Sequence, residues 1–395
     1  MNAQDVRGMT PLMLAIATDR ANPETVKLLL AKGVDPAIKD KNGESAIDWA
    51  RKFQYPPVLA ALGVEQARNW APAAMVAAAE SKPVLSAIAV ERGLVVLQRT
   101  NAGFLNEGGC FACHAQNLAG IVVNAARANG FKVDKAVAAG LARGVRIGWS
   151  SFEQPLLQRM DPPGGADMLD YALFQMASGG PEADRTTDAL VHNLAAMQRT
   201  AGNWAFGGIA RPPMEDGNFS RTALSIRVMQ VFGAPARKAE FSDRAGRASG
   251  WLMRATPRTS EDRDMQLLGL KWSNAEPATI ERLMNELAGL QRTNGGWAQT
   301  PELSSDAYAT GQALFALREA GMPPSNPVYR RGVEFLVRTQ KEDGSWRVVS
   351  RAPKFQPYFQ SGFPYDHDQW ISAAGTAWAT LSLSYAEAGV KSRAD

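Results

Sequence analysis

A short sequence motif that contains a glutamine, a glycine and a tryptophan recurs along this chain, and we call it the phrase. It constrains the fold more than any other feature. Its copies, complete or partial, occupy residues 97–101, 197–204, 290–297 and 337–346. Successive copies lie near fifty residues apart or near twice that distance, and a fixed period of this size indicates a repeat protein. Each copy ends a helix-like segment and leads, through a loop, into a more apolar segment rich in alanine. The phrase therefore predicts repeated helix hairpins.

Six such hairpins follow from this pattern. The first segments of the pairs are expected near residues 84–100, 134–158, 185–200, 236–255, 277–293 and 327–341. The second segments are expected near residues 116–130, 167–180, 219–233, 264–275, 306–321 and 371–388. The second segments carry small residues that allow close helix packing, so we expect them to form a buried inner ring, with their more charged partners outside. Six hairpins that close on themselves form an all-α fold, an (α/α)6 toroid.

The copies at residues 291–297 and 340–346 match the Gln-x-x-x-Gly-x-Trp motif. In this respect the chain resembles the prenyltransferase and squalene-cyclase repeat family. The resemblance covers about three quarters of the chain and implies the toroid, with activity on polyprenyl substrates as one function. Cyclases of that family protonate their substrate with an Asp-x-Asp-Asp acid, which this sequence lacks. Asp262-Arg263-Asp264 is the nearest approach, and we interpret it as a solvated loop.

The first 64 residues resemble part of an ankyrin array. Thr10-Pro11-Leu12-Met13-Leu14-Ala15 matches the family's T-P-L-H-x-A motif, with methionine in place of histidine. A second, weaker start follows at residues 45–50, so about one and a half repeats are expected. The predicted domains are an ankyrin segment at 1–64, a linker at 65–83 and the toroid at 84–395. The ankyrin segment is expected either to bind protein or to cap the next domain.

Both cysteines of the chain lie in one stretch, Cys110-Phe111-Ala112-Cys113-His114. This stretch fits the C-x-x-C-H pattern for attachment of a c-type haem. Thioethers at Cys110 and Cys113, with His114 as the iron ligand, would hold one covalent haem. The stretch precedes the first inner segment, so the haem is expected at the mouth of the toroid.

Three other interpretations of the cysteines stay open. Zinc held by Cys110, Cys113, His114 and His367 would complete a tetrahedral set, and protein prenyltransferases with a single toroid carry zinc at the same mouth. An internal thioester between Cys113 and Gln116 is the second, since the segment resembles that of complement-type thioester domains. A disulfide or a pair of inert thiols is the third.

The loop before the last inner segment is the longest of its kind, and it carries His367 between Asp366 and Asp368. In a closed ring this loop neighbours the first hairpin. His367 is therefore our first candidate for a second iron ligand or a distal acid–base group. Met214, in the loop before the third inner segment, is the thioether alternative. Tyr358 and Tyr365 would line the distal side in a haem enzyme.

A periplasmic electron-transfer protein with a redox partner protein is the function predicted from the haem motif. A haem peroxidase or oxygenase acting on a lipophilic substrate in the barrel is the second hypothesis, and a terpenoid cyclase or prenyltransferase is the third. Haem attachment implies export; since residues 1–5 lack a signal sequence, we expect the chain to be truncated. The net charge of +4 comes from dispersed residues, so nucleic acid is not expected as a partner. No apolar run approaches the roughly 20 residues of a transmembrane segment.

Overall fold

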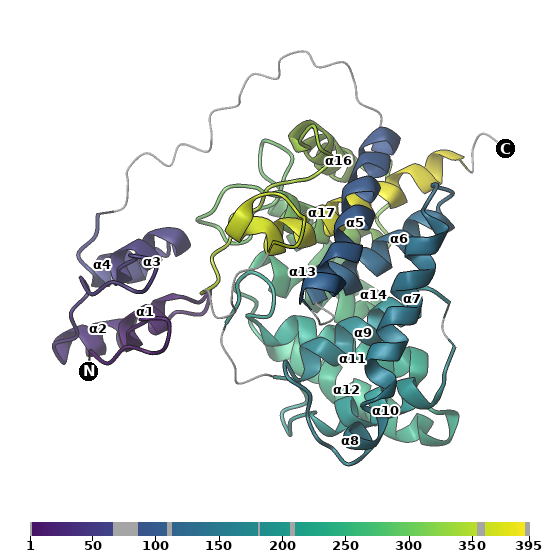
Figure 1. Ribbon diagram of the computed structural model, residues 1–395, viewed down its shortest axis with the longest axis horizontal. Coiled ribbons are helices and arrows are strands. Elements are labelled where there is room, and N and C mark those ends of the chain that lie inside the picture. Colours follow the sequence, from purple (N-terminus) through teal and green to yellow (C-terminus); the bar gives the residue numbers. More distant parts are fainter. Residues whose placement is uncertain are drawn as a thin grey trace.

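The computed structural model describes residues 2–65, 86–108, 113–180, 182–205, 210–353 and 360–391. Within these ranges the regular structure is helical, and the β pairings are isolated bridges, from Lys39 to Ser45 and from Ala298 to Ser305. Four short N-terminal helices lie at one side of a larger helical body (Figure 1). None of the described helices is long and apolar enough to cross a lipid bilayer.

The larger body consists of helix pairs. The outer helices are α5 (Ser86–Gly108), α7 (Lys135–Ser150), α10 (Arg185–Ala196), α12 (Lys238–Arg254), α14 (Pro277–Gly289) and α16 (Pro327–Thr339). The inner helices are α6 (Leu118–Ala128), α9 (Ala166–Ser178), α11 (Asn218–Phe232), α13 (Ser260–Trp272), α15 (Ala307–Ala320) and α17 (Gln369–Lys391). Each inner helix contacts the next, and α17 contacts α6, which closes the ring. The prediction of an (α/α)6 toroid is confirmed.

One expected outer segment, 134–158, is divided in two. Helix α7 ends at Ser150, where the N–H groups of Ser151 and Phe152 both donate to the carbonyl of Trp149. A short helix, α8 (Glu153–Leu157), follows this turn and packs on α10. Three further short helices occur outside the pairs: η1 (Cys113–Asn117), η2 (Pro235–Arg237) and η3 (Asp366–Asp368).

The two rings differ in burial as their sequences predict. Twelve of the fourteen residues of α15 are buried. Helix α16 buries one stripe, at Tyr329, Gly332, Phe335 and Leu336. Small residues let the inner helices approach closely: a Cβ at Gly311 would lie 2.5 Å from the backbone of α17. Most of the hydrophobic core therefore lies between the rings and within the inner one.

The tryptophan of the recurring phrase fixes the end of its own outer helix. The indole N–H groups of Trp204, Trp297 and Trp346 each donate to a backbone carbonyl ten residues earlier, at 2.7 to 2.9 Å. All three side chains are fully buried, so each hydrogen bond satisfies a polar atom that water cannot reach. The repeated phrase thus encodes a repeated local structure.

The glutamine of the phrase ties one outer helix to the next. The Nε2 atoms of Gln198, Gln291 and Gln340 donate to backbone carbonyls of α12, α16 and α5, each at 2.8 Å. The bond from Gln340 to Ala89 spans 251 residues and joins the last outer helix to the first. Gly344 permits this approach, because its φ is +88° and a Cβ there would lie 2.4 Å from a carbonyl oxygen of α5. The same device that links neighbours therefore also closes the ring.

The N-terminal helices form two antiparallel pairs: α1 (Pro11–Ile16) with α2 (Pro23–Ala31), and α3 (Ala46–Phe53) with α4 (Pro56–Ala61). Thr10 and Ser45 cap α1 and α3 at equivalent places in their repeats. These helices share a core that is separate from the toroid's and is centred on Trp49, whose indole donates to the buried Asp40. The weaker second repeat start in the sequence therefore does begin a second helix pair.

Candidate functional site

All inner helices begin at one face of the toroid, because inner and outer helices alternate along the chain. We call this face the mouth. Its described loops include residues 210–217 before α11, 255–259 before α13, 298–306 before α15, and 347–353 with 360–368 before α17. Side chains near the starts of different inner helices therefore meet inside the mouth, however far apart they lie in the sequence.

A first layer of polar side chains lies in the opening turns of four inner helices. Arg221 of α11 donates through Nε and Nη2 to the same carboxylate oxygen of Asp167 on α9, at 2.8 and 2.6 Å. On the next two inner helices, the hydroxyl of Tyr308 in α15 donates to Oε2 of Glu261 in α13, at 3.0 Å. None of these four residues is more than 7% exposed. They form a polar layer sealed from bulk water.

A second layer lies one helical turn deeper. The hydroxyl of Ser225 on α11 donates to the carboxylate of Asp170 on α9, at 3.0 Å. Asp264 follows Glu261 by three residues on α13, so the two side chains share a face of that helix. Within the described part of the chain, neither carboxylate oxygen of Asp264 has a hydrogen-bond partner, and the residue is fully buried. We refer to Asp167, Asp170, Glu261 and Asp264 as the acid cluster.

Burial dominates the protonation of the acid cluster. It raises the pKa of Asp170, Glu261 and Asp264 well above the ordinary range of carboxyl groups. It also raises the pKa of Asp167 to about 7, although the Arg221 guanidinium favours the ionised form. Arg221 offsets the charge of one carboxylate, and burial favours the protonated form of the other acids. The interior of the toroid therefore holds carboxyl groups that bind their protons more tightly than exposed ones do.

The ankyrin segment lies on the mouth through a loop between α1 and α2. In this loop, Asp19 pairs with Arg351 of the toroid, and the two side chains are only 3% and 4% exposed. Arg20 donates to the Asp216 carbonyl at 2.6 Å and to the Asp262 carboxylate at 2.5 Å. We call Thr18-Asp19-Arg20 the ankyrin finger. Of the two roles expected for this segment, the contacts show the cap.

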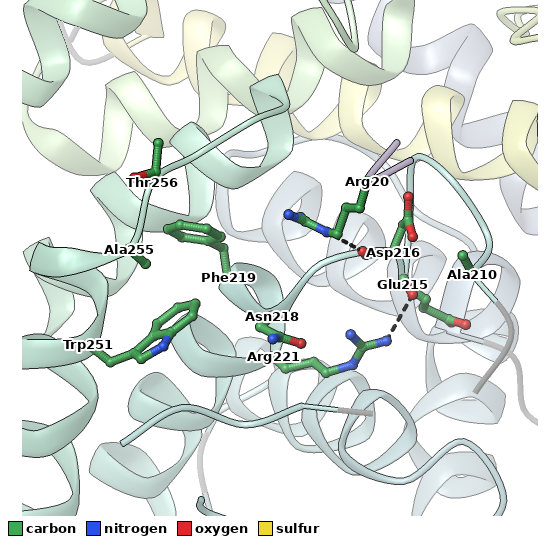
Figure 2. Close-up of a pocket in the computed structure, with 10 residues that line it drawn as sticks. All are labelled: Arg20, Ala210, Glu215, Asp216, Asn218, Phe219, Arg221, Trp251, Ala255 and Thr256. Atoms are coloured by element: carbon green, nitrogen blue, oxygen red, sulfur yellow. Dashed lines mark hydrogen bonds between the residues drawn. The ribbon is translucent and has the colours of Figure 1, made fainter. Parts of the chain in front are cut away.

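A pocket of about 390 Å³ opens beside the finger, at the start of α11 (Figure 2). Its lining consists of Arg20, Ala210, Glu215, Asp216, Asn218, Phe219, Arg221, Trp251, Ala255 and Thr256. Arg20 and Arg221 approach it from the finger and from the acid cluster, and the aromatic rings of Phe219 and Trp251 form another wall (Figure 2). Because Arg221 also binds Asp167, the pocket ends directly against the first polar layer.

Most of the residues predicted from the cysteine motif cannot be compared with the structure. Cys110, Phe111 and Tyr358 lie outside the described residues. Cys113 and His114 are described through their backbone, which forms the start of η1 and leads into α6. Gln116, the proposed thioester partner, is buried in η1. The haem, zinc and thioester interpretations therefore stay predictions.

The other predicted ligands have defined surroundings. His367 lies exposed in η3, and its neighbour Asp368 accepts from the Arg347 guanidinium at 3.0 Å. The hydroxyl of Tyr365 lies 2.6 Å from that of Ser345, and burial raises its pKa. Met214 is buried in the hydrophobic core. The described residues contain no group of three or more His, Cys, Asp or Glu that could hold a metal ion.

The interpretation of Asp262-Arg263-Asp264 as a solvated loop is wrong. These residues lie in the first turns of α13, and the two aspartates are 2% and 0% exposed. The available signal was Thr259, which stands three residues before Asp262 and forms a capping box with it. The first and last hairpins are neighbours as predicted, since α17 contacts α5, η1 and η3.

Comparison with known proteins finds likeness to two kinds of protein. The ankyrin-repeat family matches residues 7–41. A drimenyl diphosphate synthase of Streptantibioticus cattleyicolor is 35% identical over 75 residues, which are 19% of this chain and 14% of that protein. A squalene–hopene cyclase of Bradyrhizobium diazoefficiens is 33% identical over 96 residues, which are 22% of this chain and 13% of that protein. The chain thus matches about a seventh of the length of these relatives.

Solved structures resemble the toroid at low sequence identity. The type II terpene cyclase MstE from Scytonema is 15% identical with a TM-score of 0.45, over 76% of this chain and 98% of that one. A protein from Actinoplanes is also 15% identical, with a TM-score of 0.43, over 76% of this chain and 99% of that one.

The prediction of a haem electron-transfer protein is wrong. The relatives that the chain matches are a drimenyl diphosphate synthase and a squalene–hopene cyclase. These findings favour the terpenoid-cyclase hypothesis instead. The predicted redox partner is likewise unsupported, whereas an ankyrin segment is typical of proteins that bind other proteins.

Proposed function

We propose that this chain is a cyclase-like enzyme that starts a reaction of an isoprenoid by protonating one of its double bonds inside the toroid. The observation that carries the proposal is the acid cluster, a set of buried carboxyl groups whose pKa values burial raises well above the ordinary range. An acid that protonates an alkene must hold a proton at working pH and act where water cannot capture the carbocation. The buried layers inside the mouth meet both requirements.

Glu261 is the acid that we favour. Its proton passes to an alkene carbon as the O–H bond breaks and a C–H bond forms, which leaves a carboxylate on Glu261 and a carbocation on the substrate. The Tyr308 hydroxyl, 3.0 Å from Oε2, donates to that carboxylate, and the charge of Arg221 also stabilises it. Asp264 has no such donor in the described chain, so it is the weaker acid and the better proton reserve.

Aromatic side chains deeper in the barrel support the same proposal. Phe315 and Trp378 lie 5.5 Å apart between ring centroids, on α15 and α17. Both follow the acid layers in the direction of the inner helices. An aromatic face attracts a cation within about 6 Å of the ring, so such residues can stabilise a carbocation that migrates inward.

The two relatives point to the same substrate class. Their names, drimenyl diphosphate synthase and squalene–hopene cyclase, concern isoprenoids, and each matches a short part of this chain. This chain lacks the Asp-x-Asp-Asp motif that cyclases of the resembling family use, so we place the acid on side chains that come from separate inner helices.

The test is incubation with farnesyl diphosphate, geranylgeranyl diphosphate and squalene in D₂O, with products analysed by gas chromatography and mass spectrometry. Protonation by an acid that exchanges with solvent predicts a cyclic product that carries one added deuterium. The Glu261→Gln variant should lose product by about 100-fold or more, the effect expected for removal of a general acid. Products without deuterium would contradict initiation by a protein acid.

A matched control separates chemistry from charge. Glu286→Gln changes an exposed glutamate on α14, which pairs with Arg282 at 2.6 Å, and it should leave the rate unchanged. A Glu261→Gln variant that is folded and fully active would show that Glu261 is not the acid. Failure of all three substrates with the wild-type chain would count against the substrate class.

The cysteine motif forms a separate proposal that rests on the sequence. One covalent haem or one zinc ion at Cys110, Cys113 and His114 can be recognised by a pyridine haemochrome spectrum and by metal analysis of the purified chain. The mechanism above assigns these residues no step. Cyclisation should therefore survive in a Cys110→Ala/Cys113→Ala variant, and its loss would show that the motif takes part. Export of the chain likewise stays a prediction.

A further inference from the structure

The ankyrin finger bridges three elements at the mouth, namely the loop before α11, the first turn of α13 and the loop before α17. Asp19 reaches Arg351 in the loop before α17, and Arg20 reaches Asp262 at the start of α13. The hydroxyl of Thr18 and the N–H of Asp19 both donate to the Asp216 carboxylate, before α11, at 3.0 and 2.8 Å. A surface loop of the ankyrin segment thus links the starts of three inner helices, α11, α13 and α17.

The finger fits the mouth closely. A Cβ added at Gly217 would lie 2.3 Å from the Arg20 guanidinium and 2.8 Å from the Asp262 carboxylate, so no larger residue could stand there with the finger in place. The Arg351 guanidinium also lies over the ring of Phe53 in α3, 5.0 Å from its centroid. Burial of Asp19 and Arg351 to 3% and 4% exposure shows that water is excluded from this contact.

The finger also bounds the path to the acid cluster. Arg20 forms one wall of the pocket beside α11, and Arg221, which binds Asp167, forms its inner end (Figure 2). If the finger left, the Arg20 wall would be lost and the Asp262 carboxylate at the start of α13 would face solvent. Glu261 is the residue before Asp262 and lies in the same first turn of α13.

The contact between finger and mouth is polar, which suits repeated opening. Its residues are charged or hydroxylic, and charged groups regain hydration when they separate. Burial and the neighbouring Asp19 carboxylate raise the pKa of Asp216 to about 7, while the Arg20 guanidinium opposes this rise. Arg351 faces the same group of acids from the loop before α17. Docking of the finger therefore brings the Asp19 and Asp216 carboxyl groups together between the guanidinium groups of Arg20 and Arg351. An apolar interface would be harder to reopen.

We propose that the ankyrin finger is a lid on the toroid: docked, it seals the acid cluster from water, and undocked, it admits substrate through the pocket beside α11. This proposal assigns the ankyrin segment a role at the acid cluster. The test of the lid by analysis of reaction products rests on the proposed function. The structural readout does not depend on any substrate.

Hydrogen exchange of the full-length chain, read by mass spectrometry, tests the lid. The Asp19→Asn/Arg20→Gln variant should raise exchange about tenfold or more in peptides that cover residues 217–222 and 259–264, the first turns of α11 and α13. Peptides from α14 and from α1–α4 should keep their protection. Arg351→Gln, which leaves the ankyrin sequence intact, should give the same pattern. Glu24→Gln/Lys27→Gln removes an exposed ion pair of α2 and should change nothing at the mouth.

Products provide the second readout. With the finger released, water reaches the carbocation, so the fraction of hydroxylated products should rise at the expense of the hydrocarbon. Unchanged exchange at the mouth in both the Asp19→Asn/Arg20→Gln and Arg351→Gln variants would overturn the lid. If exchange rises as expected but no isoprenoid is converted by any variant, the lid stands and the proposed function fails.

Discussion

Replacement of Asp264 by asparagine should reduce the pH dependence of the toroid's stability. The Asp264 carboxyl group is fully buried, and burial together with Glu261 raises its pKa well above the ordinary value. Between the unfolded pKa, about 3.9, and the raised folded pKa, the folded chain therefore binds more protons than the unfolded chain. Its free energy of unfolding must fall as the pH rises through that window.

The size of the effect follows from linkage alone. One carboxyl group that stays protonated in the folded chain and ionises on unfolding contributes about 1.4 kcal/mol per pH unit to the slope. Asparagine cannot ionise and has nearly the same shape, so Asp264→Asn should remove that amount. Relative to the wild type, the variant should gain stability steadily as the pH rises from about 4 toward the raised folded pKa of Asp264, while Asp170 and Glu261 contribute slopes of the same sign.

Guanidinium unfolding at several pH values, followed by fluorescence of the buried tryptophans, provides the measurement. The control is Glu286→Gln, whose exposed side chain should leave the slope as in the wild type. Two parallel lines for wild type and Asp264→Asn, separated by a constant free energy, would refute the reasoning, because Asp264 would then be ionised in the folded chain.

Three other predictions concern the ring and its helix caps. Gly344→Ala should destabilise the toroid by about 2–4 kcal/mol in chemical denaturation, because φ is +88° and the new Cβ would meet the Arg92 carbonyl. The control is Gly140→Ala in α7, which has open space around it and should instead stabilise the toroid by about 0.5–1 kcal/mol. Gln340→Ala should cost about 1–3 kcal/mol by leaving buried groups of the closing contact unpaired, and an unchanged denaturation midpoint would contradict that role. Burial raises the pKa of Asp306 to about 6, so the wild type should lose about 2 kcal/mol between pH 4 and 6 that Asp306→Asn retains. Equal losses in both titrations would argue against this role of Asp306.

The helices of the toroid could be predicted closely because the recurring phrase marks them. The expected inner segment at 306–321 is α15 (Ala307–Ala320), and Asp306 turns out to be its N-cap. The expected outer segment at 277–293 is α14 (Pro277–Gly289), which ends before the phrase begins. Periodic burial and turn glycines are local properties, so they are visible in a single sequence.

A motif search reaches one member of the acid cluster, Asp264, which lies in the near match Asp262-Arg263-Asp264. The first polar layer belongs to no motif: Asp167, Arg221, Glu261 and Tyr308 are scattered over 142 residues, and they meet because each occupies an opening turn of an inner helix. A weaker signal was present: Asp170 stands in an otherwise apolar run expected to be buried. A charged residue in a buried segment predicts a partner or a proton, and this argument would have pointed to the interior of the toroid.

The docking of the ankyrin finger lay beyond any argument from the sequence. The pairs of Asp19 with Arg351 and Arg20 with Asp262 join residues 332 and 242 positions apart. Both depend on how two separately folded cores are placed against each other. Ion pairs between charged loops produce no periodic pattern in the amino-acid sequence.

The hydrogen bond from Gln340 to Ala89 also determines the point in synthesis at which the ring can close. As the chain leaves the ribosome, the earlier helix pairs can stack only into an open arc, with one flank of α5 bare until α16 and α17 are synthesised. Contacts between distant parts of a chain form slowly, so this seam is expected to be the last to assemble. A nascent chain that stalls before residue 340 would expose that flank to other chains. The final helix pair therefore decides whether synthesis yields a ring or an aggregation-prone arc.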